Sequence, residues 1–138
     1  MPQKPFIVIA CKVFQDLFEK YLPAEKVEQV TYLDLGLHVT PVKLQAAIQS
    51  QLDSLAQPSR VLLGYGLCGN GLKDLQAGIH TLLIPKVDDC IAVLLGSYQS
   101  YQEQFQSDPA TYWLYKGWLE SGSNPLSEYK QYVEKYGD

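Results

Sequence analysis

A chain of 138 residues with 46% hydrophobic residues has the size and composition of one globular domain with its own core. The net charge of −4 disfavours nucleic acid as a partner, because a negative surface field repels a phosphate backbone. The longest apolar runs, residues 6–10 and 91–95, are far shorter than the ~20 residues of a membrane-spanning helix, so we expect no membrane segment. A cytoplasmic location is expected as well, because no leader-type segment opens the chain and its 3 cysteines are an odd number for a disulfide framework.

Strand and helix patterns alternate along the first half of the chain. Residues 6–10 are apolar on both faces, which is typical of a buried parallel strand. Apolar residues then recur at helical spacing over 13–22, and a Val, Thr and Tyr-rich segment predicts a strand over 27–33. A second helix is predicted to begin at Pro41 behind the N-cap residue Thr40 and to end before Pro58.

The second half predicts the remaining elements of the same alternation. These are a strand over 61–66, a glycine-rich turn over 67–71, a short helix over 72–76, a strand over 81–84, a helix from 91 to about 105, an aromatic-rich edge strand or packed loop over 111–118, and a last helix over 125–136 with Leu126, Tyr129 and Val133 facing inward. The pattern predicts a single α/β domain over 1–138, Rossmann-like, with about four parallel strands and helices on both faces. Ligands of such sheets bind outside the carboxyl ends of the strands, near the point where the strand order reverses.

Each predicted strand is followed by a side chain that binds soft metals. Cys11 follows the first strand, His38 the second, Cys68 the third and Cys90 the fourth. Because parallel strands end at one edge of the sheet, we expect these four residues to converge on a metal site. Three thiolates suit zinc, Cu(I) or an iron–sulfur cluster, and we place zinc ahead of a [4Fe–4S] cluster. Any one cysteine taken alone is more typical of a protein core than of a metal site.

Residues beside these ligands have both a structural and a functional interpretation. Asp89 precedes a predicted helix together with Asp88, so it either caps that helix or, as a candidate catalytic residue, orients a ligand or moves a proton. Tyr65, Gly66 and Gly69 belong to a loop that either cradles a cofactor with its N–H groups or only turns the chain to place Cys68.

Two further features lie away from the predicted ligands. His80 precedes a strand, at the opposite edge of the sheet, and we expect a structural role for it. An aromatic cluster is predicted to form a packed lid, an interface patch or the wall of a planar cofactor's pocket; it consists of Tyr112, Trp113, Tyr115 and Trp118.

The chain resembles the domain of unknown function 1638 family in segments that keep their order over most of its length. The segments are Ile7 to Cys11, Leu37-His38 with Pro41, Tyr65 to Gly69, Pro85 with Asp89 to Ile91, Leu94 to Ser97, Thr111-Tyr112 and Gly117-Trp118. The resemblance implies that Cys11, His38, Cys68 and Cys90 are the family's recurrent polar positions. It also implies a context of corrinoid-dependent methyltransferases, near which such proteins tend to be encoded.

The chain departs from that family pattern at three positions. Lys12 stands where glycine is expected, Lys86 where arginine is usual and Asp88 where histidine often precedes the Asp-Cys pair. The resemblance also implies that family members continue beyond a segment like Tyr136-Gly-Asp138, so this sequence is expected to lack a C-terminal extension.

The residues predict a metal-binding protein, and the resemblance implies that it acts in methyl or thiol-group transfer or in one-carbon metabolism. The alternatives are an iron–sulfur electron-transfer protein, a non-enzymatic metal carrier or assembly partner of a corrinoid methyltransferase, and a structural zinc domain. Whether the protein is an enzyme stays open, and an enzyme of this kind would perform metal-dependent methyl transfer or redox chemistry. The expected partners are a corrinoid or methyltransferase protein and a second copy of the chain.

Overall fold

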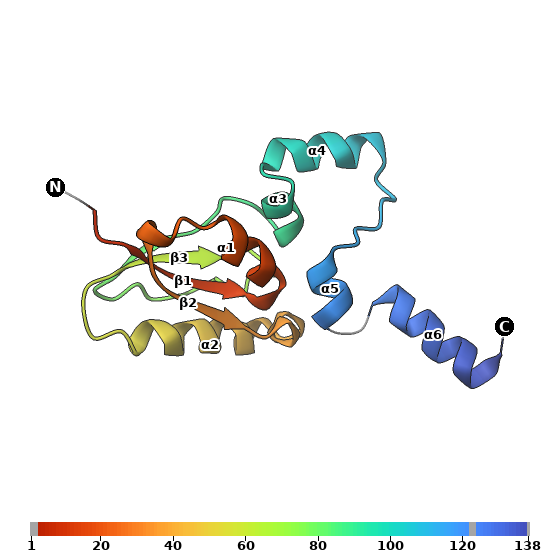
Figure 1. The fold of residues 1–138 in the computed structure, drawn as a ribbon, viewed down its shortest axis with the longest axis horizontal. Coiled ribbons are helices and arrows are strands. Elements are labelled where there is room, and N and C mark those ends of the chain that lie inside the picture. The colour runs from red at the N-terminus through yellow and green to blue at the C-terminus, as the bar shows by residue number, and fades with distance from the viewer. Residues whose placement is uncertain (1–2, 122–123, 138) are drawn as a thin grey trace.

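The computed structural model describes residues 3–121 and 124–137 and has a four-stranded parallel sheet at its centre (Figure 1). The strands are β1 (Phe6–Cys11), β2 (Val27–Leu33), β3 (Arg60–Gly64) and β4 (Thr81–Leu83), and they lie in the order β2-β1-β3-β4. Every neighbouring pair is parallel. The α/β class with a small parallel sheet, predicted from the alternation of strand and helix patterns, is therefore confirmed.

The strand order reverses next to β1, which makes the end of β1 and β3 the switch point of the sheet. The chain passes from β1 to β2 on one side and then returns across β1 to β3 on the other. Ala10 pairs with Gly64 at this end of the two strands. A Cβ on Gly64 would lie 2.5 Å from the Ala10 Cβ and 2.8 Å from the Phe18 ring, so the missing side chain lets helix α1 pack closely on the strands.

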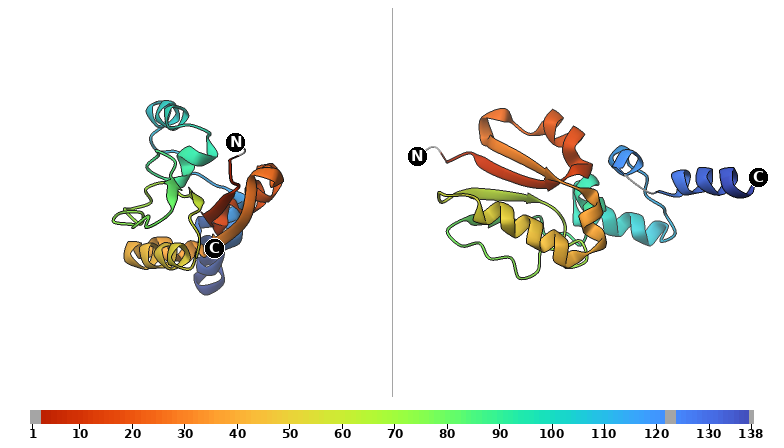
Figure 2. Two further views of the ribbon diagram at one scale, coloured as in Figure 1. Left: turned by 90° about the vertical axis from the view of Figure 1, so that its left-hand side faces the viewer. Right: turned by 90° about the horizontal axis from the view of Figure 1, so that it is seen from below.

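Helices α1 (Gln15–Tyr21) and α2 (Pro41–Asp53) cover opposite faces of the sheet, as the view from below shows (Figure 2). Three residues of α2 spaced by four, Leu44, Ile48 and Leu52, are at most 1% exposed and form the stripe that packs on the sheet. Burying each contributes about 2 kcal/mol. Pro41 occupies the first turn of α2 as predicted, although the Thr40 side chain makes no capping hydrogen bond.

Short 3₁₀ turns complete the connections at the strand ends. They are η1 (Lys12–Phe14), which leads into α1, η2 (Ala24–Lys26), which precedes β2, and η3 (Leu35–Val39), which follows β2 and leads to α2. The Asp34 side chain accepts a hydrogen bond from the Gly36 N–H at 2.7 Å and so begins η3.

Two helix predictions in the second half are wrong. Residues 72–76 form turns and extended chain in place of a short helix, because Asn70 and Asp74 adopt positive φ angles of 69° and 62°. The helix predicted from 91 to about 105 is two helices, α3 (Cys90–Leu94) and α4 (Tyr98–Ser107). Gly96 separates them with a φ of 84°, which a helix interior does not allow.

The C-terminal third extends away from the sheet (Figures 1 and 2). The aromatic-rich segment runs as a loop into helix α5 (Lys116–Ser121), which packs on η1 at Gly117, where a Cβ would lie 2.4 Å from the Val13 carbonyl oxygen. Helix α6 (Pro125–Tyr136) forms as predicted, but the inward orientation predicted for its apolar residues is wrong for Leu126 and Tyr129, which are 51% and 61% exposed. Helical periodicity specified an apolar face and left open what would cover it.

Among the described residues, none of the helices combines the length and the apolar character that crossing a membrane requires.

Candidate metal centre

Four connections place the predicted ligands at the carboxyl edge of the sheet. Cys11 is the last residue of β1, His38 lies in η3 behind β2, Cys68 lies in the loop behind β3, and Cys90 is the first residue of α3 behind β4. Their order along the rim therefore follows the order of the strands, and Cys11 and Cys68 flank the switch point.

Cys11 and His38 are in direct contact. The Nε2 atom of His38 lies 3.3 Å from the Cys11 Sγ, and the Cys11 side chain is only 1% exposed. Burial raises the pKa of the Cys11 thiol to about 11 and lowers the pKa of His38, because the charged form of each loses its hydration. A neutral thiol and a neutral imidazole therefore meet at the end of β1.

The loops that carry Cys68 and Cys90 are held together by their backbones. The N–H of Leu67 donates to the Val87 carbonyl oxygen and the N–H of Cys68 donates to the Asp88 carbonyl oxygen, both at 3.0 Å. A Cβ on Gly66 would lie 2.7 Å from the Asp89 Cα. The structure thus gives Gly66 a packing role that allows this close approach, and its predicted cofactor contact stays a prediction.

The turn at Cys68 has an unusual backbone. Cys68, Gly69 and Asn70 have consecutive φ angles of 47°, 65° and 69°, all in the left-handed region. That region costs a residue other than glycine roughly 1–2 kcal/mol, and such conformations concentrate at ligand-binding sites. Gly69 meets this requirement without strain, so its position is explained by the turn that places the Cys68 thiol.

The three thiols influence one another electrostatically. Burial, and after it the charges of Cys68, Asp89 and Cys11 in that order, raises the pKa of Cys90 to about 12. Burial likewise raises the pKa of Cys68, with Asp89 adding to the effect. All three thiols are consequently protonated near pH 7 and none is an activated nucleophile, whereas a bound cation reverses this preference by stabilising the thiolates.

Asp89 caps helix α3. Its Oδ1 accepts hydrogen bonds from the N–H groups of Ile91 at 2.9 Å and Ala92 at 3.3 Å. The capping interpretation is therefore confirmed, and a role in proton transfer or ligand orientation stays a prediction. His80 lies at the other edge of the sheet, where its Nδ1 accepts a hydrogen bond from the Ser59 N–H at 3.3 Å, as a structural role requires.

Tyr65, directly behind β3, has a buried hydroxyl without a partner. The side chain is 0% exposed, and within the described part of the chain its Oη has no hydrogen-bond partner. Leaving a buried hydroxyl unpaired costs about 1–3 kcal/mol. Its ring lies against the His38 ring, with centroids 5.6 Å apart, so this unpaired group sits beside the predicted ligands.

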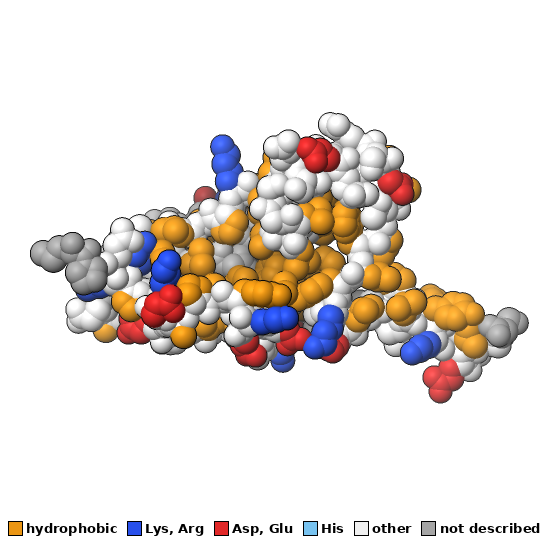
Figure 3. Space-filling view, turned by 45° about the horizontal axis from the view of Figure 1, so that its top comes forward, with side chains coloured by type: hydrophobic (Ala, Val, Ile, Leu, Met, Phe, Trp, Pro, Cys, Tyr) orange, Lys and Arg blue, Asp and Glu red, His pale blue; other side chains and the backbone are white. Residues whose placement is uncertain are grey.

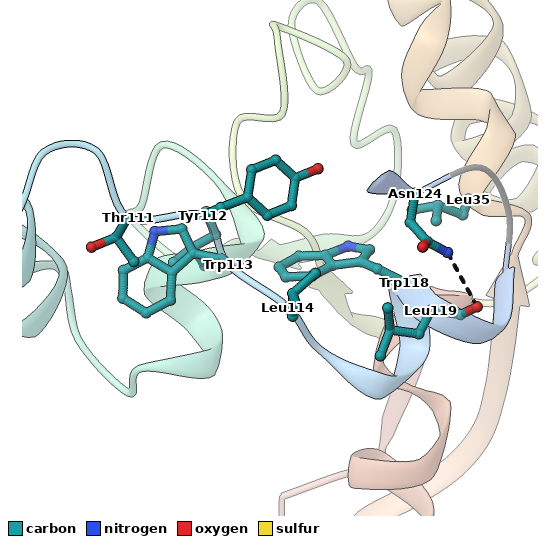
Figure 4. Close-up of a pocket in the computed structure, with 9 residues that line it drawn as sticks. Leu35, Thr111, Tyr112, Trp113, Leu114, Trp118, Leu119 and Asn124 are labelled. Carbon is teal, nitrogen blue, oxygen red and sulfur yellow. Dashed lines mark hydrogen bonds between the residues drawn. The ribbon is translucent and has the colours of Figure 1, made fainter. Parts of the chain in front are cut away.

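A cavity of about 450 Å³ lies next to the rim (Figure 4). The indole of Trp118 forms part of its wall with Tyr112 and Trp113. Leu35 in η3 and Ile91, the neighbour of Cys90 in α3, also line the cavity. Figure 3 shows the hydrophobic side chains that gather in the hollow beneath α4. Its size is that of a small-molecule pocket.

The aromatic cluster predicted from the sequence divides between this cavity and its support. Tyr112, Trp113 and Trp118 line the cavity, whereas Tyr115 packs edge-on against Trp118 with ring centroids 5.8 Å apart. Sequence reasoning missed Leu35 and Ile91, because single apolar residues carry no signal that distinguishes a pocket wall from a core.

The four predicted ligands do not form a coordination shell. Among residues 3–121 and 124–137, no group of three or more His, Cys, Asp or Glu side chains has the spacing that holds a metal ion. The structure thus brings the four predicted residues to one rim and pairs two of them, Cys11 and His38, without forming a coordination shell.

These features define a Rossmann-like α/β protein with three cysteines and one histidine along the carboxyl edge of its sheet, of which Cys11 and His38 are in contact. The model of the family described as protein of unknown function (DUF1638) matches residues 32–138, and the chain belongs to this family. The matched segment includes His38, Cys68 and Cys90, and Cys11 precedes it. No curated protein and no solved structure matches the chain.

Proposed function

We propose that this protein binds one soft or borderline metal ion, with zinc as the first candidate, through Cys11, Cys68 and Cys90. His38 either completes the coordination or stays hydrogen-bonded to the Cys11 sulfur. The observation that carries the proposal is that three cysteines, one buried and two half-buried, lie at or after the ends of three different strands at the same edge of the sheet, where His38 contacts the Cys11 sulfur at 3.3 Å. Cysteines that serve only as small core residues have no reason to meet at one rim.

The thiols must converge further before they can hold an ion. They are neutral as they stand, so nothing draws them together, and a divalent cation would supply the attraction once it displaces their protons. The Cys68 turn and the start of the helix at Cys90 lie outside the strands, so a movement of these two connections need not disturb the sheet. The site is therefore proposed to assemble on the metal.

Methyl or thiol-group transfer is the chemistry we propose for the loaded site. Three protein ligands leave zinc a fourth position, and zinc there holds an incoming substrate thiol as a reactive thiolate. The cavity beside α3 is where the remainder of an apolar or aromatic substrate would bind, because Ile91 in its wall is the neighbour of Cys90. A cytoplasmic location, where thiols stay reduced, belongs to the same proposal.

A purely structural zinc is the less favoured role. The buried core in β1, α2 and β3, which includes Val8, Leu44 and Leu63, lies within the sheet and helix layers and supports a fold that does not depend on the metal. Iron–sulfur electron transfer and metal carriage for a corrinoid methyltransferase are the remaining alternatives. Helix α6 exposes the aromatic residues Tyr129, Tyr132 and Tyr136, and this surface is the one that a partner protein or a second copy would cover.

Metal analysis of protein purified without oxygen tests the proposal. We expect one colourless zinc per chain, and less than about a tenth of that in Cys11→Ser, Cys68→Ser and Cys90→Ser. The metal content of His38→Gln tests whether His38 completes the coordination. His80→Gln is the matched control for this variant and should keep full metal content. Visible absorption typical of an iron–sulfur cluster would instead support the electron-transfer alternative. Unchanged metal content in all three cysteine variants would refute the shared site.

A further inference from the structure

Tyr65 offers the rim a hydrogen-bond donor that the chain itself does not use. The side chain is 0% exposed, and no acceptor for its hydroxyl lies within the described residues. Water cannot satisfy this group from outside, because the side chain is sealed. A buried hydroxyl of this kind calls for an explanation beyond packing, since a phenylalanine would fill the same space at lower cost.

The surroundings of Tyr65 are the members of the candidate metal centre. Its ring packs against the His38 ring at a tilt of 38°, and His38 in turn contacts the Cys11 Sγ. After burial, the two groups that raise the pKa of Tyr65 most are Cys11 and then Cys68, so negative charge on these sulfurs reaches the phenol. The buried phenol therefore lies beside the contact between His38 and Cys11.

A loaded site needs such a donor. One divalent ion with three thiolates carries an excess negative charge, and Cys11 is the most deeply buried of the three at 1% exposed. Burial of that charge is costly unless a hydrogen bond stabilises it, and donors to metal-bound ligands tune both affinity and reactivity. Neither lysine nor arginine is among the groups that affect the pKa values of the three thiols.

We infer that the Tyr65 hydroxyl is a positioning group of the metal centre, which donates its hydrogen bond to the Cys11 sulfur once that sulfur is a metal-bound thiolate. The inference rests on the proposed function. In the metal-free protein the Tyr65 hydroxyl has no partner among the described residues, and it gains the Cys11 sulfur as its acceptor when metal binding displaces the thiol proton and brings the two groups together. Tyr65 thus stabilises the loaded state relative to the metal-free state, because its hydroxyl has an acceptor only in the loaded state.

The variant Tyr65→Phe tests this inference because it is expected to act in opposite directions on two measurements. Zinc affinity, measured by competition with a chromophoric chelator, should weaken by about 10- to 100-fold. The urea midpoint of the metal-free protein should stay the same or rise, because an unpaired hydroxyl has been removed. Tyr21→Phe, at a site that is 68% exposed, is the matched control and should change neither quantity.

Cobalt(II) in place of zinc provides a spectroscopic readout. Loss of a hydrogen bond to a coordinated sulfur should move the sulfur-to-cobalt charge-transfer band of Tyr65→Phe to longer wavelength than in the wild type. Equal zinc affinity and an unchanged band in the variant would overturn the inference while leaving the metal site intact. A midpoint that falls together with the affinity would assign Tyr65 to packing, and a wild type that binds neither ion would refute the proposed function and this inference with it.

Discussion

The contact between the Cys68 and Cys90 loops gives the sharpest test of how the fold builds the rim. The variant Gly66→Ala would place a Cβ within 2.7 to 2.8 Å of three backbone atoms of Asp89. Backbone atoms cannot rotate away as a side chain can, so the two loops must separate. Gly66 is not among the residues with positive φ, so alanine fits its backbone and the effect is steric alone.

The cost follows from the hydrogen bonds that hold the loops together. Separation breaks or stretches the bonds from Leu67 to Val87 and from Cys68 to Asp88, each 3.0 Å long. At about 1 kcal/mol for each, the metal-free variant should lose about 2 kcal/mol of its free energy of unfolding. The separating loops carry Cys68 and Cys90 away from each other. Zinc affinity should therefore fall by at least about tenfold, which is typical when residues that orient a metal ligand are lost.

Gly78→Ala is the matched control for this variant. A Cβ there meets nothing within 4 Å, and the φ of 57° makes the substitution cost about 1 kcal/mol through the backbone only. Urea unfolding of the chelator-treated proteins and zinc competition should therefore separate the two variants by affinity more than by stability. Wild-type zinc affinity in Gly66→Ala would refute the reasoning that this glycine brings the two cysteine loops together.

Three further predictions concern stability. Ile48→Ala should destabilise the protein by about 2–5 kcal/mol in urea unfolding, because it leaves a cavity at a site that is 0% exposed. The control Val42→Ala, at a site that is 72% exposed, should cost under about 0.5 kcal/mol. Similar losses of stability in both variants would contradict the packing of α2. Asp89→Ala should cost about 1 kcal/mol through the lost N-cap and Asp89→Asn much less, and thermal unfolding that ranks them in reverse would show that capping is not its contribution. The pKa of Cys11 is about 11 in the folded chain against an ordinary 9.0, so the unfolded chain loses its proton first. Stability of the metal-free protein should accordingly be full below pH 9 and fall towards pH 11 by up to about 1.4 kcal/mol per pH unit for this thiol, and no decline in urea midpoints over that range would show that Cys11 is not buried as a neutral thiol.

The strand pattern predicted the sheet because local signals mark where the first strand begins and the last one ends. Pro5 precedes β1 and Pro85 follows β4, and apolar runs on both faces gave the parallel pairing. Placing the four candidate ligands at one edge then needed only the rule that parallel strands point the same way. The sequence reaches this far because strand ends are local features.

Other parts of the rim depend on contacts between distant segments. The closeness of Gly66 to Asp89 and the left-handed turn at Cys68 arise from two loops that meet only in the folded chain. The break at Gly96 could have been found, since glycine inside a helical pattern is a common helix end. The exposure of Leu126 in α6 could not have been predicted, because an apolar helix face indicates burial but does not show which segment packs against it.

The most direct measurement of the central claim is X-ray absorption at the zinc edge of the zinc-loaded chain at one ion per monomer. The chain has only 3 cysteines, so a shell of three sulfurs at about 2.3 Å would assign Cys11, Cys68 and Cys90 together. We expect that shell, with one nitrogen or oxygen at about 2.0–2.1 Å. A shell with one sulfur or none would show that the three strand ends do not share an ion.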